Sequence, residues 1–109
     1  VIDMEMLEKM NQATLEEKLA TGKYVLFFTA DWCPDCTFIK PYMPEIEAQF
    51  ADYKFLQVDR DENIDLCQEL MVMGIPSFIV YEDGKEVDRF VNGDRKTKAE
   101  VVDFLAQVN

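Results

Sequence analysis

The sequence predicts an α/β fold in which a mixed central sheet carries helices on both faces. Helical and strand-like segments alternate in the first half of the chain, a pattern typical of βαβ units with parallel strands. Two strand-like segments near the C-terminus are separated only by Asp83-Gly84, which is a strong signal for an antiparallel hairpin. The length of 109 residues suits one domain over 1–109.

The N-terminal third is expected to contain one helix and the first inner strand. Residues 4–12 fit either a helical period or a short edge strand. Thr14 and Glu17 have the spacing of a capping box, so a helix is expected to begin there and to end by Gly22. Residues 24–29 form a continuous apolar run, as in strands that are buried on both faces of a sheet.

The remaining elements continue the alternation. Residues 33–50 are expected to form a helix that Pro41 and Pro44 kink, because proline lacks an amide hydrogen and crowds the preceding turn. The elements expected after it are a strand over 54–59, a helix over 62–71, hairpin strands over 77–81 and 86–91, and an amphipathic helix over 98–108.

Composition and charge narrow the possible functions. A formal net charge of −11 argues against nucleic acid or an anionic membrane as a partner. The chain has no histidine, which excludes Cys–His and Ser–His catalysis and most zinc sites. The sequence has no apolar run of membrane-spanning length, and its first eight residues lack the pattern of a secretory signal. We therefore expect a cytoplasmic protein without a metal site.

The chemistry is expected at Cys33 and Cys36, which lie in a Trp-Cys-Pro-Asp-Cys segment between a buried strand and a helix. Ligands of open α/β sheets bind beyond the carboxyl ends of the strands, and free amides at a helix start favour a thiolate. Pro34 suits the first helical position because no amide hydrogen is needed there. We expect Cys33 to attack a substrate disulfide and the deeper Cys36 to resolve the mixed disulfide.

Other interpretations of these residues remain open. A bare C-x-x-C pair also occurs as half of a metal site, here a zinc site shared between two chains, or as an inert pair. Asp35 suits the first helical turn, although its carboxylate would also repel a nearby thiolate. The third cysteine, Cys67, is expected to be a buried small hydrophobic residue.

With these features the chain resembles the thioredoxin family from about Thr14 to the C-terminus. The motifs that carry the resemblance are residues 29–36, Pro41, the Gly-Ile-Pro-Ser-Phe segment at 74–78, Asp83-Gly84 and Gly93. The resemblance implies a thioredoxin fold with Pro76 in the cis form beside the cysteines. It also implies a substrate surface in which the Ile75 backbone pairs with an extended substrate strand; that surface comprises Trp32, Pro34, Ile75, Pro76 and Gly93.

The resemblance further implies a protein disulfide reductase that works through a redox-active Cys33–Cys36 disulfide and binds no cofactor. The chain lacks a Gly-rich dinucleotide fingerprint, so its electrons are expected to come from an NADPH-dependent flavoprotein thioredoxin reductase. We expect a monomer that acts on disulfide-containing proteins. The alternatives are a dedicated electron donor to one enzyme, such as a peroxidase, and a thioredoxin-fold binding module with passive cysteines.

Two departures from the family pattern affect the site. Pro34-Asp35 separates the cysteines where Gly-Pro is common, and Phe27 and Phe55 occupy positions where many thioredoxins carry a buried acid and a lysine. The usual proton acceptor for Cys36 is therefore missing. Our hypothesis is that Asp35, or water near it, assists Cys36 instead; the alternative is that Asp35 only favours the start of the helix.

Overall fold

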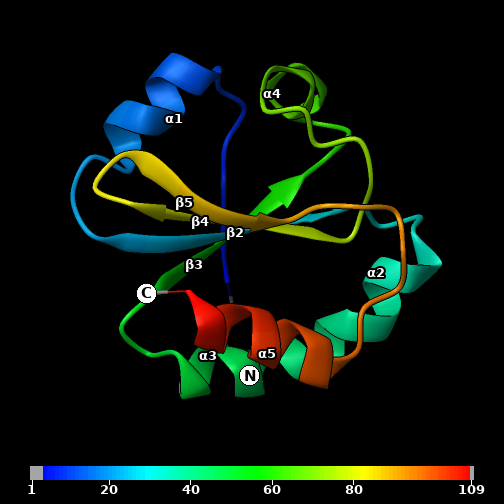
Figure 1. Cartoon of the computed structure of the whole chain (residues 1–109). Coiled ribbons are helices and arrows are strands. Elements are labelled where there is room, and N and C mark those ends of the chain that lie inside the picture. The colour runs from blue at the N-terminus through cyan, green and yellow to red at the C-terminus, as the bar shows by residue number, and fades with distance from the viewer. Residues whose placement is uncertain (1–3, 109) are drawn as a thin grey trace.

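The computed structural model describes residues 4–108 and consists of a five-stranded sheet between two layers of helices (Figure 1). The strands are β1 (Glu5–Met6), β2 (Lys23–Thr29), β3 (Lys54–Asp59), β4 (Ser77–Glu82) and β5 (Lys85–Phe90). The helices are α1 (Gln12–Lys18), α2 (Pro34–Ile39), the 3-10 helix η1 (Lys40–Tyr42), α3 (Met43–Gln49), α4 (Ile64–Glu69) and α5 (Lys98–Gln107). The predicted α/β architecture is confirmed.

The sheet has the order β1-β3-β2-β4-β5, with β2 in the middle. β3 runs parallel to both β1 and β2, whereas β4 is antiparallel to β2 and β5 is antiparallel to β4. The apolar run 25–29 in β2 is buried throughout, which confirms the prediction of a strand covered on both faces. Because β2 lies between β3 and β4, the loop after β2 has a neighbour on each side. One neighbour is the segment that follows β3, and the other is the segment that precedes β4.

Two hydrophobic cores lie on opposite faces of the sheet, because successive side chains of a strand point to opposite sides. β2 contributes Leu26 and Phe28 to the core beneath α1 and α4, and Val25 and Phe27 to the core beneath α2, α3 and α5. Figure 1 shows the same division, with α1 and α4 on one side of the sheet and α2, α3 and α5 on the opposite side.

The capping box predicted at Thr14 and Glu17 is wrong. Helix α1 begins at Gln12, and its N-cap is Asn11, whose side-chain oxygen accepts a hydrogen bond from the Thr14 amide at 2.8 Å. Asn11 satisfies the free amide of the first turn, so the helix begins before Thr14. The helix also ends at Lys18, earlier than Gly22.

A capping box does occur at the start of α5, where the sequence analysis had not placed one. The Thr97 hydroxyl accepts from the Glu100 amide at 3.1 Å, and the Glu100 carboxylate accepts from the Thr97 amide at 2.9 Å. Two amides at the helix start are thereby satisfied. This cap holds the N-terminal end of α5, next to the loop that leaves β5.

The other elements follow the predictions with shifted boundaries. The segment around Pro41 and Pro44 is divided into α2, η1 and α3, which confirms the predicted interruption. Asp83 and Gly84 both have positive φ, 51° and 83°, as a two-residue hairpin turn requires. Within residues 4–12 the structure has the edge strand β1, and only Gln12 belongs to a helix, as the first residue of α1. Helix α4 is shorter than the predicted 62–71. In the part of the chain that the structure describes, no helix is long and apolar enough to cross a membrane.

Candidate active site

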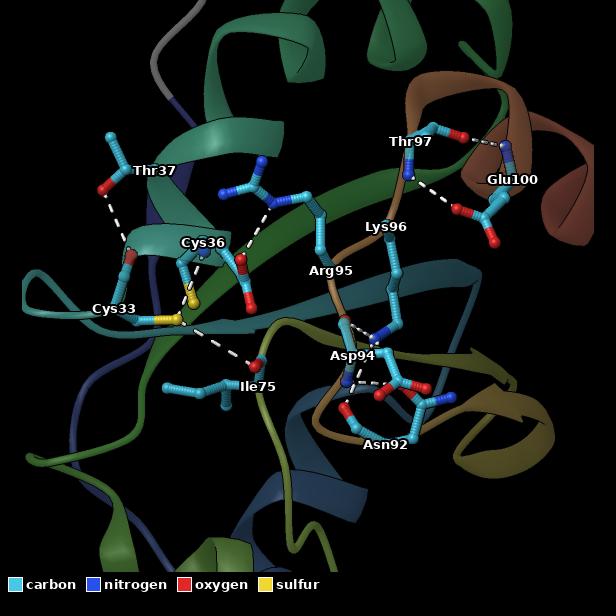
Figure 2. A network of polar contacts seen from close by, with 11 residues as sticks. Cys33, Cys36, Thr37, Ile75, Asn92, Asp94, Arg95, Lys96, Thr97 and Glu100 are labelled. Carbon is cyan, nitrogen blue, oxygen red and sulfur yellow. Dashed lines mark hydrogen bonds and ion pairs between the residues drawn. The ribbon is translucent and has the colours of Figure 1, made fainter.

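Cys33 and Cys36 lie where β2 gives way to α2. Cys33 is the N-cap of α2, and its sulfur accepts a hydrogen bond from the Cys36 amide at 3.2 Å. Pro34 occupies the start of the helix, as predicted. Cys33 is 5 % exposed and Cys36 is 1 % exposed, and both are free thiols (Figure 2). The helix start thus directs an amide hydrogen at the outer sulfur and places the second cysteine beneath it.

The inner thiol has a strongly shifted acidity. Burial raises the pKa of Cys36 to about 11, and the neighbouring Cys33 sulfur acts in the same direction. The Thr29 hydroxyl and the Ala30 backbone oppose this shift without cancelling it. Cys36 is therefore protonated at neutral pH and must lose a proton before it can act as a nucleophile.

A pocket of about 330 Å³ opens beside Cys33. Of the predicted substrate residues, Trp32, Pro34, Ile75 and Gly93 line this pocket. The Ile75–Pro76 bond is cis, as the resemblance implies, and the Ile75 carbonyl lies 3.9 Å from the Cys33 sulfur. Pro76 itself is buried and is not among the residues that line the pocket. The structure therefore brings four of the five predicted surface residues together around the outer cysteine.

Residues after β3 form one side of the pocket, and the sequence analysis did not identify them. The Trp32 indole is 59 % exposed and donates to Asp61 at 2.7 Å. The Arg60 guanidinium lies 5.7 Å from the centre of the Trp32 ring and pairs with Asp61 at 3.7 Å. Arg60 and Asp61 could have been identified from the sequence because they directly follow the strand that runs parallel to β2. The carboxyl ends of neighbouring parallel strands lie at the same edge of a sheet, where ligands bind.

Val72, Met73 and Gly74 complete the lining of the pocket. Met73 is 84 % exposed. Gly74 packs against the loop after β5: an added Cβ would lie 2.4 Å from the Gly93 nitrogen. The Ser77 hydroxyl donates to the carbonyl of Gly74 at 2.6 Å and to that of Asn92 at 3.3 Å. This close backbone contact brings Gly93 to the pocket.

Asp35 lies in the first turn of α2 and is bonded to Arg95. The Arg95 Nε donates to the Asp35 Oδ1 at 2.9 Å, and the guanidinium lies 4.3 Å from the centre of the Phe38 ring. Asp35 also lines the pocket. No local sequence pattern pairs Arg95 with Asp35, because sixty positions separate the two residues.

The positions at which the resemblance implied a buried acid and a lysine are filled by packed aromatic rings. Phe27 is fully buried and stacks on Phe78, with ring centres 5.1 Å apart and planes 15° apart. Phe55 belongs to the same core and is 5 % exposed. Neither side chain can accept a proton from Cys36. Among residues 4–108, no three His, Cys, Asp or Glu side chains gather as a metal site requires.

Comparison with known proteins extends over nearly the whole chain. A family model described as thioredoxin matches residues 6–107. The chain is 35% identical over 96 residues to an H-type thioredoxin of Fagopyrum esculentum, covering 88% of this chain and 82% of that protein. It is 35% identical over 97 residues to a thioredoxin of Staphylococcus aureus, covering 87% and 93% respectively.

Solved structures show the same similarity. The X-ray structure of Fasciola hepatica thioredoxin matches with a TM-score of 0.79 and 28% identity, and the alignment covers 97% of this chain and all of that chain. Thioredoxin from Trypanosoma brucei brucei matches with a TM-score of 0.80 over 95% of this chain and 88% of its own; at 23% identity it supports the fold alone. The family-model match over residues 6–107 includes both cysteines and every residue that lines the pocket.

Proposed function

The chain belongs to the thioredoxin family and is a protein thiol–disulfide oxidoreductase, and from this premise we propose that Cys33 is its attacking thiolate and Cys36 its resolving thiol. The observation that carries the assignment is the asymmetry of the pair. The Cys33 sulfur faces the pocket and accepts the Cys36 amide hydrogen, whereas the Cys36 sulfur is buried behind it. A hydrogen bond to a sulfur favours its thiolate form.

In the first step the Cys33 thiolate attacks one sulfur of a substrate disulfide. A new bond forms between that sulfur and Cys33, the substrate S–S bond breaks, and the other substrate sulfur leaves as a thiolate. We propose that the Ile75 backbone aligns an extended substrate segment and that Trp32, Pro34, Pro76 and Gly93 shape the surface around it. The placement of four of these residues around one pocket supports this role.

In the second step the Cys36 thiol loses its proton and attacks the Cys33 sulfur of the mixed disulfide. The second substrate sulfur leaves, so the substrate gains two electrons and the chain is left with a Cys33–Cys36 disulfide. Because burial raises the pKa of Cys36 to about 11, this step needs a proton acceptor. We propose Asp35, or water held near it, because Phe27 and Phe55 occupy the positions where many thioredoxins carry a buried acid and a lysine.

The catalytic cycle closes when the Cys33–Cys36 disulfide is reduced again. Thioredoxins use a redox-active cysteine pair without an external cofactor, and we propose that an NADPH-dependent flavoprotein thioredoxin reductase supplies the electrons. We further propose that the chain acts in the cytoplasm, as a monomeric single domain over 1–109, in electron transfer to disulfide-containing proteins. A compartment that keeps thiols reduced favours this direction of transfer.

Coupled NADPH oxidation with a thioredoxin reductase and a protein disulfide tests the assignment. Cys33→Ser should abolish turnover, and Cys36→Ser should abolish turnover while accumulating a mixed disulfide between Cys33 and the substrate. Cys67→Ala is the matched control, because Cys67 is a buried cysteine in α4, and it should retain turnover. A mixed disulfide trapped on Cys36 in Cys33→Ser would reverse the roles. Unchanged binding of a partner by all variants without turnover would favour a binding module.

A further inference from the structure

Asp35 places a negative charge beside the cysteine that must ionise. It lies between the two cysteines in the first turn of α2 and lines the pocket with Cys33. A carboxylate close to a thiol disfavours the thiolate. Its bonded partner is Arg95, whose Nε donates to the Asp35 Oδ1 at 2.9 Å. The Arg95 guanidinium also lies over the Phe38 ring, which is one helical turn further along α2.

The backbone on both sides of Arg95 is held in place. Lys96, only 1 % exposed, turns inward, and its ammonium donates to the Asn92 side-chain oxygen at 2.9 Å, the Asn92 carbonyl at 3.3 Å and the Asp94 carbonyl at 2.8 Å. Thr97 then begins the capping box of α5. Figure 2 shows Arg95 reaching to α2 while Lys96 turns toward Asn92 and Asp94. These contacts fix the backbone from which the Arg95 side chain extends toward α2.

We propose that Arg95 is a positioning residue for thiol–disulfide exchange: it holds the Asp35 carboxylate on the face of α2 that carries Phe38 and offsets the negative charge of that carboxylate beside the attacking cysteine, Cys33. The proposal rests on the assignment of Cys33 as the nucleophile. It also accounts for an acid between the cysteines, because the carboxylate is already engaged by a cation that comes from outside the helix.

Several titratable or charged groups lie near Cys33. On α2 itself they are Asp35, which is bonded to Arg95, and Cys36, which is protonated and uncharged at neutral pH. From the segment after β3, Arg60 lines the pocket, and it is paired with Asp61. From the loop after β5, Gly93 lines the pocket, and the Lys96 ammonium, which donates to the Asn92 side chain and the Asp94 carbonyl, interacts electrostatically with Cys36 and Asp35. Arg95 is not among the residues that line the pocket, and its side-chain hydrogen bond toward α2 is to Asp35. In the proposed arrangement its influence on Cys33 therefore passes through that carboxylate.

The test is the rate of alkylation of the reduced full chain by iodoacetamide between pH 5 and 9, with the adduct assigned by peptide mass spectrometry. Arg95→Gln should slow alkylation of Cys33 at neutral pH by about two- to fivefold, the range expected from a partly exposed charge pair, and move the profile to higher pH. Arg95→Lys should restore little, because an ammonium has neither the planar stack nor the directed Nε bond. Far-UV circular dichroism checks the fold of each variant.

The same alkylation measurement in the Asp35→Asn variant distinguishes a positioning role of Arg95, which needs the Asp35 carboxylate, from a direct effect of the Arg95 charge on Cys33. In that background, Arg95→Gln should produce no further slowing, because Arg95 acts through the carboxylate that is already gone. Arg89→Gln is the matched control: Arg89 pairs with Glu86 on β5, at 2.6 Å, so the variant loses the same charge away from the site. It should alkylate at the wild-type rate.

Several results would overturn the proposal. If Arg95→Gln slowed alkylation equally in the wild-type and Asp35→Asn backgrounds, the Arg95 charge would act directly on Cys33 and not through Asp35. Complete rescue by Arg95→Lys would likewise show that only the positive charge matters. No slowing at all would show that the ion pair has no influence on Cys33. Preferential alkylation of Cys36 in the wild type would instead contradict the proposed roles of the cysteines, so the two failures are distinguishable.

Discussion

The three cysteines are all buried, yet their surroundings divide them into different chemical classes. Burial raises the pKa of Cys67 and of Cys36 to about 11 in each case. Cys33 differs because it adjoins the pocket and accepts an amide hydrogen bond. The exposed fraction of the residue alone would not separate Cys33 from the others, since all three values are 5 % or less. The direction of one amide and the opening of the pocket make the distinction.

Substitution by alanine should change the free energy of unfolding by different amounts at two glycines that line the pocket. Gly74→Ala should lower the free energy of unfolding by roughly 1–3 kcal/mol, because the new Cβ would overlap backbone atoms of the opposing loop. Gly93→Ala should change it by less than about 0.5 kcal/mol, because no atom lies within 4 Å of the added Cβ. Urea unfolding of both variants checks this. Equal destabilisation would contradict the close contact at Gly74.

The helices show how one sequence pattern leads to two outcomes. Thr14 and Thr97 are each followed three positions later by glutamate, but only Thr97 forms a capping box. Before Thr14 the chain offers Asn11, whose side chain already accepts the Thr14 amide. The helix therefore starts at the first adequate cap, and Thr14 becomes a residue within the first turn.

Alanine substitutions should reveal this difference in stability. Thr97→Ala and Asn11→Ala should each cost about 1 kcal/mol of unfolding free energy, because a helix amide loses its side-chain acceptor. Thr14→Ala should cost less than about 0.5 kcal/mol, because its hydroxyl is not the cap. Urea unfolding curves with a shared slope provide the comparison. A larger loss for Thr14→Ala than for Asn11→Ala would contradict the helix start seen in the structure.

The molecule as a whole buries groups that ionise only at high pH. Burial raises the pKa of Cys36 and Cys67 from 9.0 to about 11, and that of Tyr81 from 10.0 to about 12. The folded chain therefore keeps protons that the unfolded chain releases. By linkage, this stabilisation is complete below about pH 9 and is lost as the pH rises toward 12.

Stability should accordingly fall steeply in alkali. Under reducing conditions, the free energy of unfolding should decrease between pH 9 and 11, with roughly 2–3 kcal/mol at stake for each fully buried group over its whole range. The Cys67→Ala, Tyr81→Phe double variant lacks two of the three groups and should show a shallower decline. Urea unfolding at pH 8, 9, 10 and 11 checks both chains. An identical decline of the unfolding free energy with pH in the two chains would contradict a contribution of the buried Cys67 and Tyr81 to the alkaline loss of stability.

The sequence by itself determined the features that depend on near neighbours. The apolar run 24–29 indicated an inner strand, Asp83-Gly84 indicated the hairpin turn, and the prolines indicated the break after α2. The two cysteines at a strand–helix junction pointed to thiol chemistry and, through the resemblance, to the family. These signals are local because periodicity, turn conformation and proline chemistry act over a few residues.

Only the tertiary structure decided which distant residues meet at the carboxyl end of β2. Asp35 and Arg95 are sixty positions apart, Trp32 bonds to Asp61 across the ends of two parallel strands, and Gly74 packs against Gly93. No local pattern specifies these contacts, because each depends on how separate loops converge after the sheet has formed. The chain thus encodes its nucleophile locally, whereas the charges and backbone that surround it depend on the assembled fold.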